Sequence, residues 1–236
     1  MFENKKIMIV VAHPDDEILG LGATMNLLIN ERGIKTHLVI LGEGITSRSD
    51  QRDVAKWNRE LKIHKSNIEK ARLSIGYHGL SVYDLPDNRF DTIPLLDIIK
   101  IVEKEKESFL PDMIFTHHGG DLNIDHQKTF QAVMTACRPM PGENVKAIIT
   151  FETASGTEWR ASADPYHFIS NFFVSVKESN IDAKIKAMEA YEFEKRSYPH
   201  PRSGEALRIQ AKRLGITIGE EYAEAFCLVR GIIGAN

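Results

Sequence analysis

Several features that would place the chain in a particular class of protein are missing from its sequence. It has two cysteines, Cys137 and Cys227, in 236 residues, and a single pair cannot build the disulfide framework of a small secreted domain. No apolar run approaches the roughly 18 residues that a membrane span needs. The run at residues 7–12 leads straight into charged residues and is also too short for the core of a signal peptide. We therefore expect a cytoplasmic protein with reduced thiols and without a stable membrane anchor.

An excess of positive charge is missing as well. The chain has 30 lysines and arginines against 33 aspartates and glutamates, which gives a formal net charge of −3. This balance argues against a nucleic-acid partner. Neither a GxGxxG motif after the first predicted strand nor a Walker motif is present, so the common signatures of nucleotide sites are lacking.

Internal repeats, low-complexity blocks and long linkers are also absent. The hydrophobic fraction of 42% is ordinary for a globular protein. A chain of this length can bury a sizeable core and still form one domain, so we expect residues 1–236 to be a single domain. Composition leaves the oligomeric state open, including a homo-oligomer.

The sequence does contain a regular alternation of strand and helix patterns. Continuous apolar, β-rich runs are typical of buried parallel strands, and apolar residues at helical spacing predict helices that pack against them. Strands are predicted at 6–12, 36–41, 80–85, 111–118 and 145–152, and helices at 17–31, 49–75, 92–109, 124–138, 181–195 and 204–214. This order predicts an α/β fold, a Rossmann-like three-layer sandwich with a mainly parallel sheet.

Two groups of polar residues follow predicted strands of this sheet. The first strand ends at His13, and the strand that ends near Thr116 leads into His117 and His118. In open parallel sheets, ligands bind beyond the carboxyl ends of the strands. Both groups are therefore expected at the edge where a site should lie.

The first group is the segment AHPDDE at residues 12–17. Pro14 biases His13 towards an extended conformation at the strand tip. Asp15 and Asp16 are consecutive and should point in different directions, so one can bind a metal while the other acts beside it as a base. Paired acids at a helix start are also common as caps that satisfy free N–H groups, and this structural interpretation competes with the metal site.

The second group is THHGGDLNIDHQ at residues 116–127. Its two glycines allow a tight turn or close approach to a ligand, and His126 at the start of the next helix can reach back to the strand tips. Asp125 is a candidate partner for a ligating imidazole, because such rings usually donate their other N–H to an acceptor. A solvated polar loop is the competing interpretation.

Imidazole nitrogens and carboxylate oxygens together suit zinc. Catalytic zinc sites use three protein ligands and keep one position open for water, whose pKa falls towards about 7. A neighbouring carboxylate can then accept the proton of that water as it attacks a carbonyl carbon.

Taken together, the two motifs resemble the LmbE-like family of zinc deacetylases, which includes the PIG-L type de-N-acetylases. The resemblance covers residues 5 to about 140. It implies Zn²⁺ bound by His13, Asp16 and His126, with Asp15 as the general base. It also implies hydrolysis of an N-acyl group, usually acetyl, from an amino sugar that is free, nucleotide-linked, lipid-linked or part of a thiol conjugate. Surface-glycan biosynthesis is a role that such a protein can serve.

The chain departs from the family at one position. Many members carry a histidine three residues before the last ligand, and here that residue is Asn123. Asparagine can donate a hydrogen bond to an oxyanion, but it cannot act as a general acid. His117, His118 and His200 are the candidates for protonating the leaving amine, unless Asp15 returns the proton itself.

Other candidates for contact with the substrate lie in loops. Arg48 lies in a Gly/Ser-rich loop at 42–50, where the family often places an arginine, and His200 lies between two prolines and two arginines in RSYPHPRS at 196–203. The set of candidate substrate-binding residues is Arg48, His118, Asp121, Asn123 and His200.

Two functions of other classes remain open. In receiver-type signalling modules, paired acids bind Mg²⁺ beside a phosphorylated aspartate at a later strand tip, and Asp84 offers such a position. His13 and the histidine-rich loop argue against this, because Mg²⁺ prefers oxygen ligands. A metal-binding domain without catalysis is the other alternative, since a fold does not determine a function.

Overall fold

The computed structural model describes residues 2–3 and 5–234 and is built around one seven-stranded sheet. The strand order is β3-β2-β1-β4-β5-β7-β6. Neighbours among the first five strands pair in parallel, whereas β7 is antiparallel to both β5 and β6. The strands are β1 (Lys6–Val11), β2 (Lys35–Gly42), β3 (Gly79–Leu85), β4 (Met113–His117), β5 (Ala147–Phe151), β6 (Phe172–Ser175) and β7 (Ala223–Gly231).

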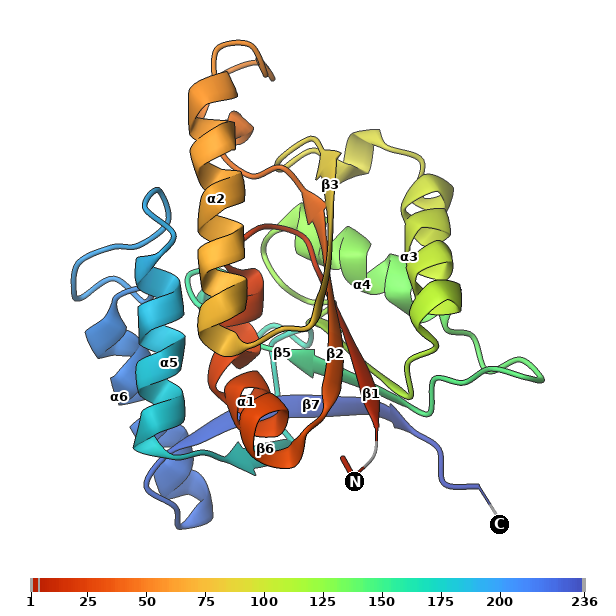
Figure 1. Ribbon diagram of the computed structural model, residues 1–236, viewed down its shortest axis with the longest axis vertical. Helices are drawn as coiled ribbons and strands as arrows, with labels where there is room; N and C mark the ends of the chain where they lie inside the picture. The colour runs from red at the N-terminus through yellow and green to blue at the C-terminus, as the bar shows by residue number, and fades with distance from the viewer. Residues whose placement is uncertain (1, 4, 235–236) are drawn as a thin grey trace.

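Helices cover both faces of the sheet (Figure 1). The helices are α1 (Asp16–Arg32), α2 (Asn58–Ile75), α3 (Leu95–Phe109), α4 (Ile124–Ala136), α5 (Glu178–Glu189) and α6 (Gly204–Ile218), with short 3₁₀ turns η1 (Thr46–Arg48), η2 (Phe90–Thr92) and η3 (Thr157–Trp159). Alternate residues of β1 face opposite ways, so Ile7 and Ile9 pack with α1, α2, α5 and α6, whereas Met8 and Val10 pack with α3 and α4. Among the described residues, no helix combines the length and apolarity that a bilayer crossing requires.

The predicted α/β class and mainly parallel sheet are confirmed, and the five predicted strands form its parallel part. Strands β6 and β7 are additional to the predicted strands. Helix α2 starts at Asn58 and not at residue 49 as predicted, because residues 49–57 form bends and turns in which the indole of Trp57 donates to the Ser49 hydroxyl. Residues 190–195, expected to be helical, form turns after α5.

Helix α1 is interrupted at Leu21, whose φ of −151° is not helical. The interruption leaves backbone groups of α1 without partners inside the helix. The Glu224 carboxylate of β7 accepts from the Thr24 N–H at 2.7 Å, and the Lys184 ammonium of α5 donates to the Leu19 carbonyl at 2.8 Å. Lys184 and Glu224 also bind each other at 2.6 Å, and both are buried. This pair holds α1 in place, and with it the acidic residues at its first turn.

Replacement of Lys184 by methionine is expected to lower the free energy of unfolding by about 3–5 kcal/mol, because it leaves the buried Glu224 carboxylate without its counter-charge. Urea denaturation followed by circular dichroism measures this change. The matched control is Lys100→Met, which breaks the exposed ion pair with Glu103 and should have a much smaller effect. Equal effects of the two substitutions would show that the buried pair does not stabilise α1.

Candidate metal centre and active site

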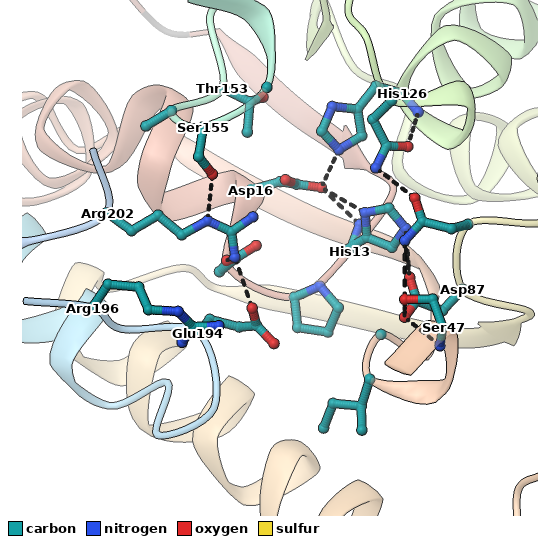
Figure 2. A pocket seen from close by; sticks show the side chains of 18 of the residues that line it. His13, Asp16, Ser47, Asp87, His126, Thr153, Ser155, Glu194, Arg196 and Arg202 are labelled. Carbon is teal, nitrogen blue, oxygen red and sulfur yellow. Dashed lines mark hydrogen bonds and ion pairs between the residues drawn. The ribbon is translucent and has the colours of Figure 1, made fainter. Parts of the chain in front are cut away.

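Three predicted ligand side chains meet at the carboxyl edge of the sheet (Figure 2). His13 follows β1, Asp16 is the first residue of α1, and His126 lies in the first turn of α4. Asp16 Oδ2 lies 3.3 Å from His126 Nε2 and 3.6 Å from His13 Nδ1. One donor atom from each residue lies within 4.8 Å of the others, and all three residues have most of their surface buried. These are distances that one cation can span.

Local sequence explains how these side chains are presented. Asp15 adopts a φ of +111°, which turns the chain between β1 and α1 so that Asp16 faces back towards His13. The Asp16 carboxylate accepts from the His13 N–H at 2.8 Å, which fixes the turn. At the other side, Asn123 caps α4, and its side-chain oxygen accepts from the N–H groups of Asp125 and His126. The capped first turn places His126 beside Asp16.

Each imidazole of this candidate ligand group has a second carboxylate near its other ring nitrogen. His13 Nε2 lies 2.8 Å from Asp125 Oδ2, and His126 Nδ1 lies 3.1 Å from Asp121 Oδ2. Such outer carboxylates fix the ring orientation and make the ligand more basic. Asp125, expected to be the partner of a ligating imidazole, therefore faces His13. Asp121 lies in the corresponding place beside His126.

The electrostatics of the three residues favour a positive charge between them. Burial disfavours the charged form of His126, but Asp16 and Asp121 outweigh it and raise its pKa to about 9. Burial likewise opposes the protonation of His13, yet Asp125 and Asp16 raise its pKa well above the usual value. Although burial favours the neutral form of Asp16, His126 and His117 hold its pKa well below the usual range. Two nitrogens and one carboxylate in such a field fit a zinc ion with a further position open.

A second group of possible ligands shares His13 and consists of His13, Asp87 and Asp125. Its Asp125 carboxylate already accepts from the backbone N–H groups of Asn88 and Phe90, at 2.6 and 2.8 Å, and faces His13 Nε2. The Asp87 carboxylate accepts from the Ser47 hydroxyl and N–H. Because these oxygens are engaged in holding loops, the His13, Asp16 and His126 group is the better cation site.

Asp121→Asn is expected to weaken zinc binding by about 10–100-fold, because it removes the negative charge behind His126 without removing a ligand. Competition with a chromogenic zinc chelator measures the dissociation constant. Asp112→Asn is the matched control, since Asp112 pairs with Lys5 at the opposite end of β1 and β4. An unchanged zinc affinity in Asp121→Asn would contradict the role assigned to this carboxylate.

Asp15 lies beside the ligand group and lines the cavity in front of it. Burial raises the pKa of its carboxyl well above the usual value, and the nearby Arg202 guanidinium opposes this shift. Arg202 Nη1 lies 2.9 Å from Asp15 Oδ2. The Asp15 N–H donates to the Glu17 carboxylate at 3.1 Å, and the Tyr191 hydroxyl binds the same carboxylate. Glu17 thus holds the backbone of the turn, and the Asp15 side chain, bound by Arg202, lies in the cavity wall.

The two histidines that follow β4 have different surroundings. His117 is fully buried, accepts from the Ala12 N–H through Nε2 at 2.9 Å, and stacks on His126 at a ring distance of 3.8 Å. Burial, together with the charge of His126, lowers the pKa of His117 to about 4. The His117 ring is therefore neutral and packs against the ring of His126. His118 Nε2 meets the carbonyl of Tyr166 at 2.8 Å. It does not line the cavity among the described residues.

The cavity has a volume of about 350 Å³. It is lined by the three predicted metal ligands and by Asp15, the predicted base. Three of the five residues expected to contact substrate also line it, namely Arg48, Asn123 and His200. His118 and Asp121 are absent from its described lining. Asp84, the phosphoacceptor of the receiver alternative, is exposed on β3 and does not line this cavity.

Further residues of the cavity were not selected from the sequence as site residues. Glu194 bridges two arginines, Arg48 at 2.5 Å and Arg202 at 2.7 Å, and Ser155 accepts from Arg202 Nε at 2.7 Å. Arg202 belongs to the segment RSYPHPRS. Its contact with Asp15 could not be predicted from the sequence, because the two residues are 187 positions apart. His64 of α2 also lines the cavity, and both of its ring nitrogens are buried and lack hydrogen-bond partners in the described structure.

Comparison with known proteins gives one family and several similar chains. The family described as PIG-L: GlcNAc-PI de-N-acetylase matches residues 8–137. The chain is also 28% identical over 195 residues to the uncharacterized deacetylase YaiS of Escherichia coli (strain K12), which covers 80% of this chain and 91% of that protein.

Solved structures share the fold at low sequence identity. The N,N'-diacetylchitobiose deacetylase from Pyrococcus horikoshii is 18% identical with a TM-score of 0.71, covering 96% of this chain and 84% of that chain. GalB, the 4-carboxy-2-hydroxymuconate hydratase from Pseudomonas putida KT2440, is 17% identical with a TM-score of 0.75, covering 98% and 99%. Because one of these is named a deacetylase and the other a hydratase, the shared fold alone does not decide the reaction.

Proposed function

The chain belongs to the PIG-L family of GlcNAc-PI de-N-acetylases and is a deacetylase; from this we propose that it uses zinc to hydrolyse the N-acetyl group of an amino sugar or sugar conjugate. The observation that carries the proposal is the group of His13, Asp16 and His126 with Asp15 beside it, at one end of a polar cavity. An N₂O donor set of this kind suits zinc.

The proposed reaction is hydrolysis of an amide, and the chain supplies its acid–base groups. Bound zinc would lower the pKa of a water and polarise the amide carbonyl. Asp15 accepts a proton from the attacking water through the carboxylate oxygen that Arg202 does not bind. His13, Asp16 and His126 keep their orientation because Asp125, the His13 N–H and Asp121 hold them from behind.

The leaving amine must then receive a proton. Asn123 cannot take the part of the missing histidine, because a side-chain amide is not an acid; its oxygen caps α4, and one amide N–H donates to Asn88 at 2.9 Å. His117 is buried behind His126, and His118 lies outside the cavity lining. His200 does line the cavity, but its Nδ1 accepts from the Arg202 N–H. We assign the return of the proton to Asp15, with His200 as a contact for the sugar.

We propose that the part of the substrate that enters the cavity is an uncharged sugar with several hydroxyl groups. Arg48 and Arg202 share the Glu194 carboxylate and so already have a counter-charge. His64 offers a buried ring without partners, whose pKa burial lowers to about 4, and a neutral ring can both donate to and accept from a hydroxyl. These features support sugar hydroxyls as ligands.

A panel of N-acetylated sugars tests the proposal. Zinc-loaded protein is incubated with N-acetylglucosamine, N-acetylgalactosamine, N,N'-diacetylchitobiose and UDP-N-acetylglucosamine, and acetate release is measured. We expect release from at least one uncharged sugar. Lipid-linked acceptors and surface-glycan fragments extend the panel to the proposed surface-glycan role. Release from simple amides such as acetanilide, with none from any sugar, would overturn the assignment of an amino-sugar substrate.

A further inference from the structure

The guanidinium of Arg202 lies where three distant segments of the chain converge (Figure 2). Its Nη1 donates to Asp15 Oδ2 at 2.9 Å and to Glu194 Oε2 at 2.7 Å, and its Nε donates to the Ser155 hydroxyl at 2.7 Å. The side chain of Arg202 is 23% exposed, and those of Asp15 and Glu194 are 4% and 13% exposed. These charged groups are therefore largely removed from solvent, where charge-assisted hydrogen bonds are strong.

Arg202 is itself held in position. Its backbone N–H donates to His200 Nδ1, and the following Ser203 caps α6 by accepting from the Ala206 N–H. The Ser155 that receives Nε lies in the loop after β5, where the Glu158 carboxylate accepts its N–H. The arginine therefore has a fixed backbone behind it and a fixed acceptor beside it, and Asp15 is the group that it can orient.

The two oxygens of the Asp15 carboxylate differ in their surroundings. Oδ2 receives the Arg202 hydrogen bond. Oδ1 has no hydrogen-bond partner in the part of the chain that the structure describes, yet it is not among the atoms sealed from solvent. Asp15 lines the cavity, and because Arg202 occupies Oδ2, Oδ1 is the oxygen left for a molecule bound there. Without Arg202 the carboxylate would be free to rotate, since the turn itself holds only the backbone of Asp15.

We propose that Arg202 is a positioning residue for the deacetylase reaction: it holds Asp15 Oδ2 so that Oδ1 faces the attacking water. The inference rests on the proposed function, because it gives Asp15 the role of base. It adds a requirement for a residue from the opposite end of the chain, beyond residues 8–137. It also gives the Glu194 carboxylate a role, which is to balance the charge of Arg202 from the other side.

Arg202→Ala is expected to lower kcat roughly 100-fold, because a misplaced catalytic group costs about that much, and to leave KM and zinc content nearly unchanged. Millimolar guanidinium, far below denaturing concentrations, should restore part of kcat by filling the vacated position. Arg202→Lys should retain more activity than Arg202→Ala. The matched control is Arg208→Ala in α6, whose arginine pairs with Glu178 and Asp182 on the surface, and it should keep wild-type kcat with or without guanidinium.

Several outcomes would overturn the inference. An unchanged kcat, or a higher one, would mean that Arg202 does not orient the base or holds it out of action. A loss of kcat that guanidinium and lysine both fail to restore, in a folded protein with full zinc content, would also contradict it. If Arg202→Ala does not fold, Ser155→Ala removes one anchor of the guanidinium and should lower kcat by a smaller factor, and an unchanged kcat there would contradict the inference.

A crystal structure of zinc-loaded Arg202→Ala separates this inference from the proposed function. The Asp15 carboxylate should be rotated or disordered in the variant and ordered in the wild type. A carboxylate that stays in place refutes the positioning role whichever substrate is used. Failure of the wild type to release acetate from any sugar would instead refute the proposed function, with the carboxylate position still reporting on Arg202.

Discussion

Replacing Asp15 by asparagine is expected to lower kcat by about 10²–10⁴-fold, the contribution of a well-placed general base. The substituted amide has nearly the same shape and can still accept from Arg202, but it cannot take a proton from water. The metal ligands are unchanged, so zinc content should stay at the wild-type value. Steady-state acetate release and metal analysis on the same preparation measure both quantities.

The control for this experiment is Asp87→Asn, which alters a carboxylate of the same cavity that accepts from Ser47. It is expected to affect kcat much less, because Asp87 holds the Ser47 loop. If Asp15→Asn keeps near wild-type activity, Asp15 is not the base. If it loses its zinc instead, Asp15 is a ligand and its role must be exchanged with that of Asp16.

Asp16→Ala should abolish activity and weaken zinc binding by more than the roughly 10–100-fold that follows the loss of an outer partner. Asp16 Oδ2 lies within 3.6 Å of nitrogens from His13, His117 and His126 and also accepts from the His13 N–H. No other carboxylate has this central position among the described residues. Removal of the Asp16 carboxylate also leaves Asp121 as the one carboxylate beside the His126 ring among the described residues.

The two possible metal groups give opposite results in this experiment. Zinc affinity is measured by chelator competition for Asp16→Ala and for Asp87→Asn. If zinc occupies the group of His13, Asp16 and His126, the first variant loses it and the second keeps it. Loss of zinc from Asp87→Asn and retention by Asp16→Ala would place the ion between His13, Asp87 and Asp125.

The local parts of the fold could be predicted because they depend on neighbouring residues. The apolar runs of β1, β2, β4 and β5 are buried on both faces of the sheet, and such strands have continuous hydrophobic patterns. Strand β6 has only four residues and β7 pairs antiparallel at the edge of the sheet, so neither carries that pattern as clearly. Residues 49–57 are polar and lack a strong breaker, which is why the helix pattern was extended over them.

The meeting of His13, Asp16 and His126 could be predicted for a topological reason. His13 and His126 follow neighbouring parallel strands, β1 and β4, and residues after the carboxyl ends of such strands meet at one edge of the sheet. The carboxylate behind each histidine was harder to assign. Asp125 is adjacent to His126 in sequence, but the helix directs it to His13, and Asp121 from the preceding turn reaches His126.

Residues that close the cavity from the C-terminal part could not be located by this reasoning. Glu194 and Arg202 lie in turns between α5 and α6, and their positions depend on how those helices pack against α1 and α2. The sequence contains the arginine and the histidine of RSYPHPRS but no information on which acid they meet. Such a contact is decided by tertiary packing, as is the orphaned ring of His64 on α2.

Metal reconstitution tests whether acetate release depends on zinc bound by His13, Asp16 and His126. The protein is stripped of metal with a chelator, and acetate release from the best sugar of the panel is measured as zinc is added back. We expect negligible activity without metal and a rise that levels off at one zinc per chain in the wild type, with no recovery in Asp16→Ala. Full activity in the stripped protein, or recovery in Asp16→Ala equal to the wild type, would contradict this expectation.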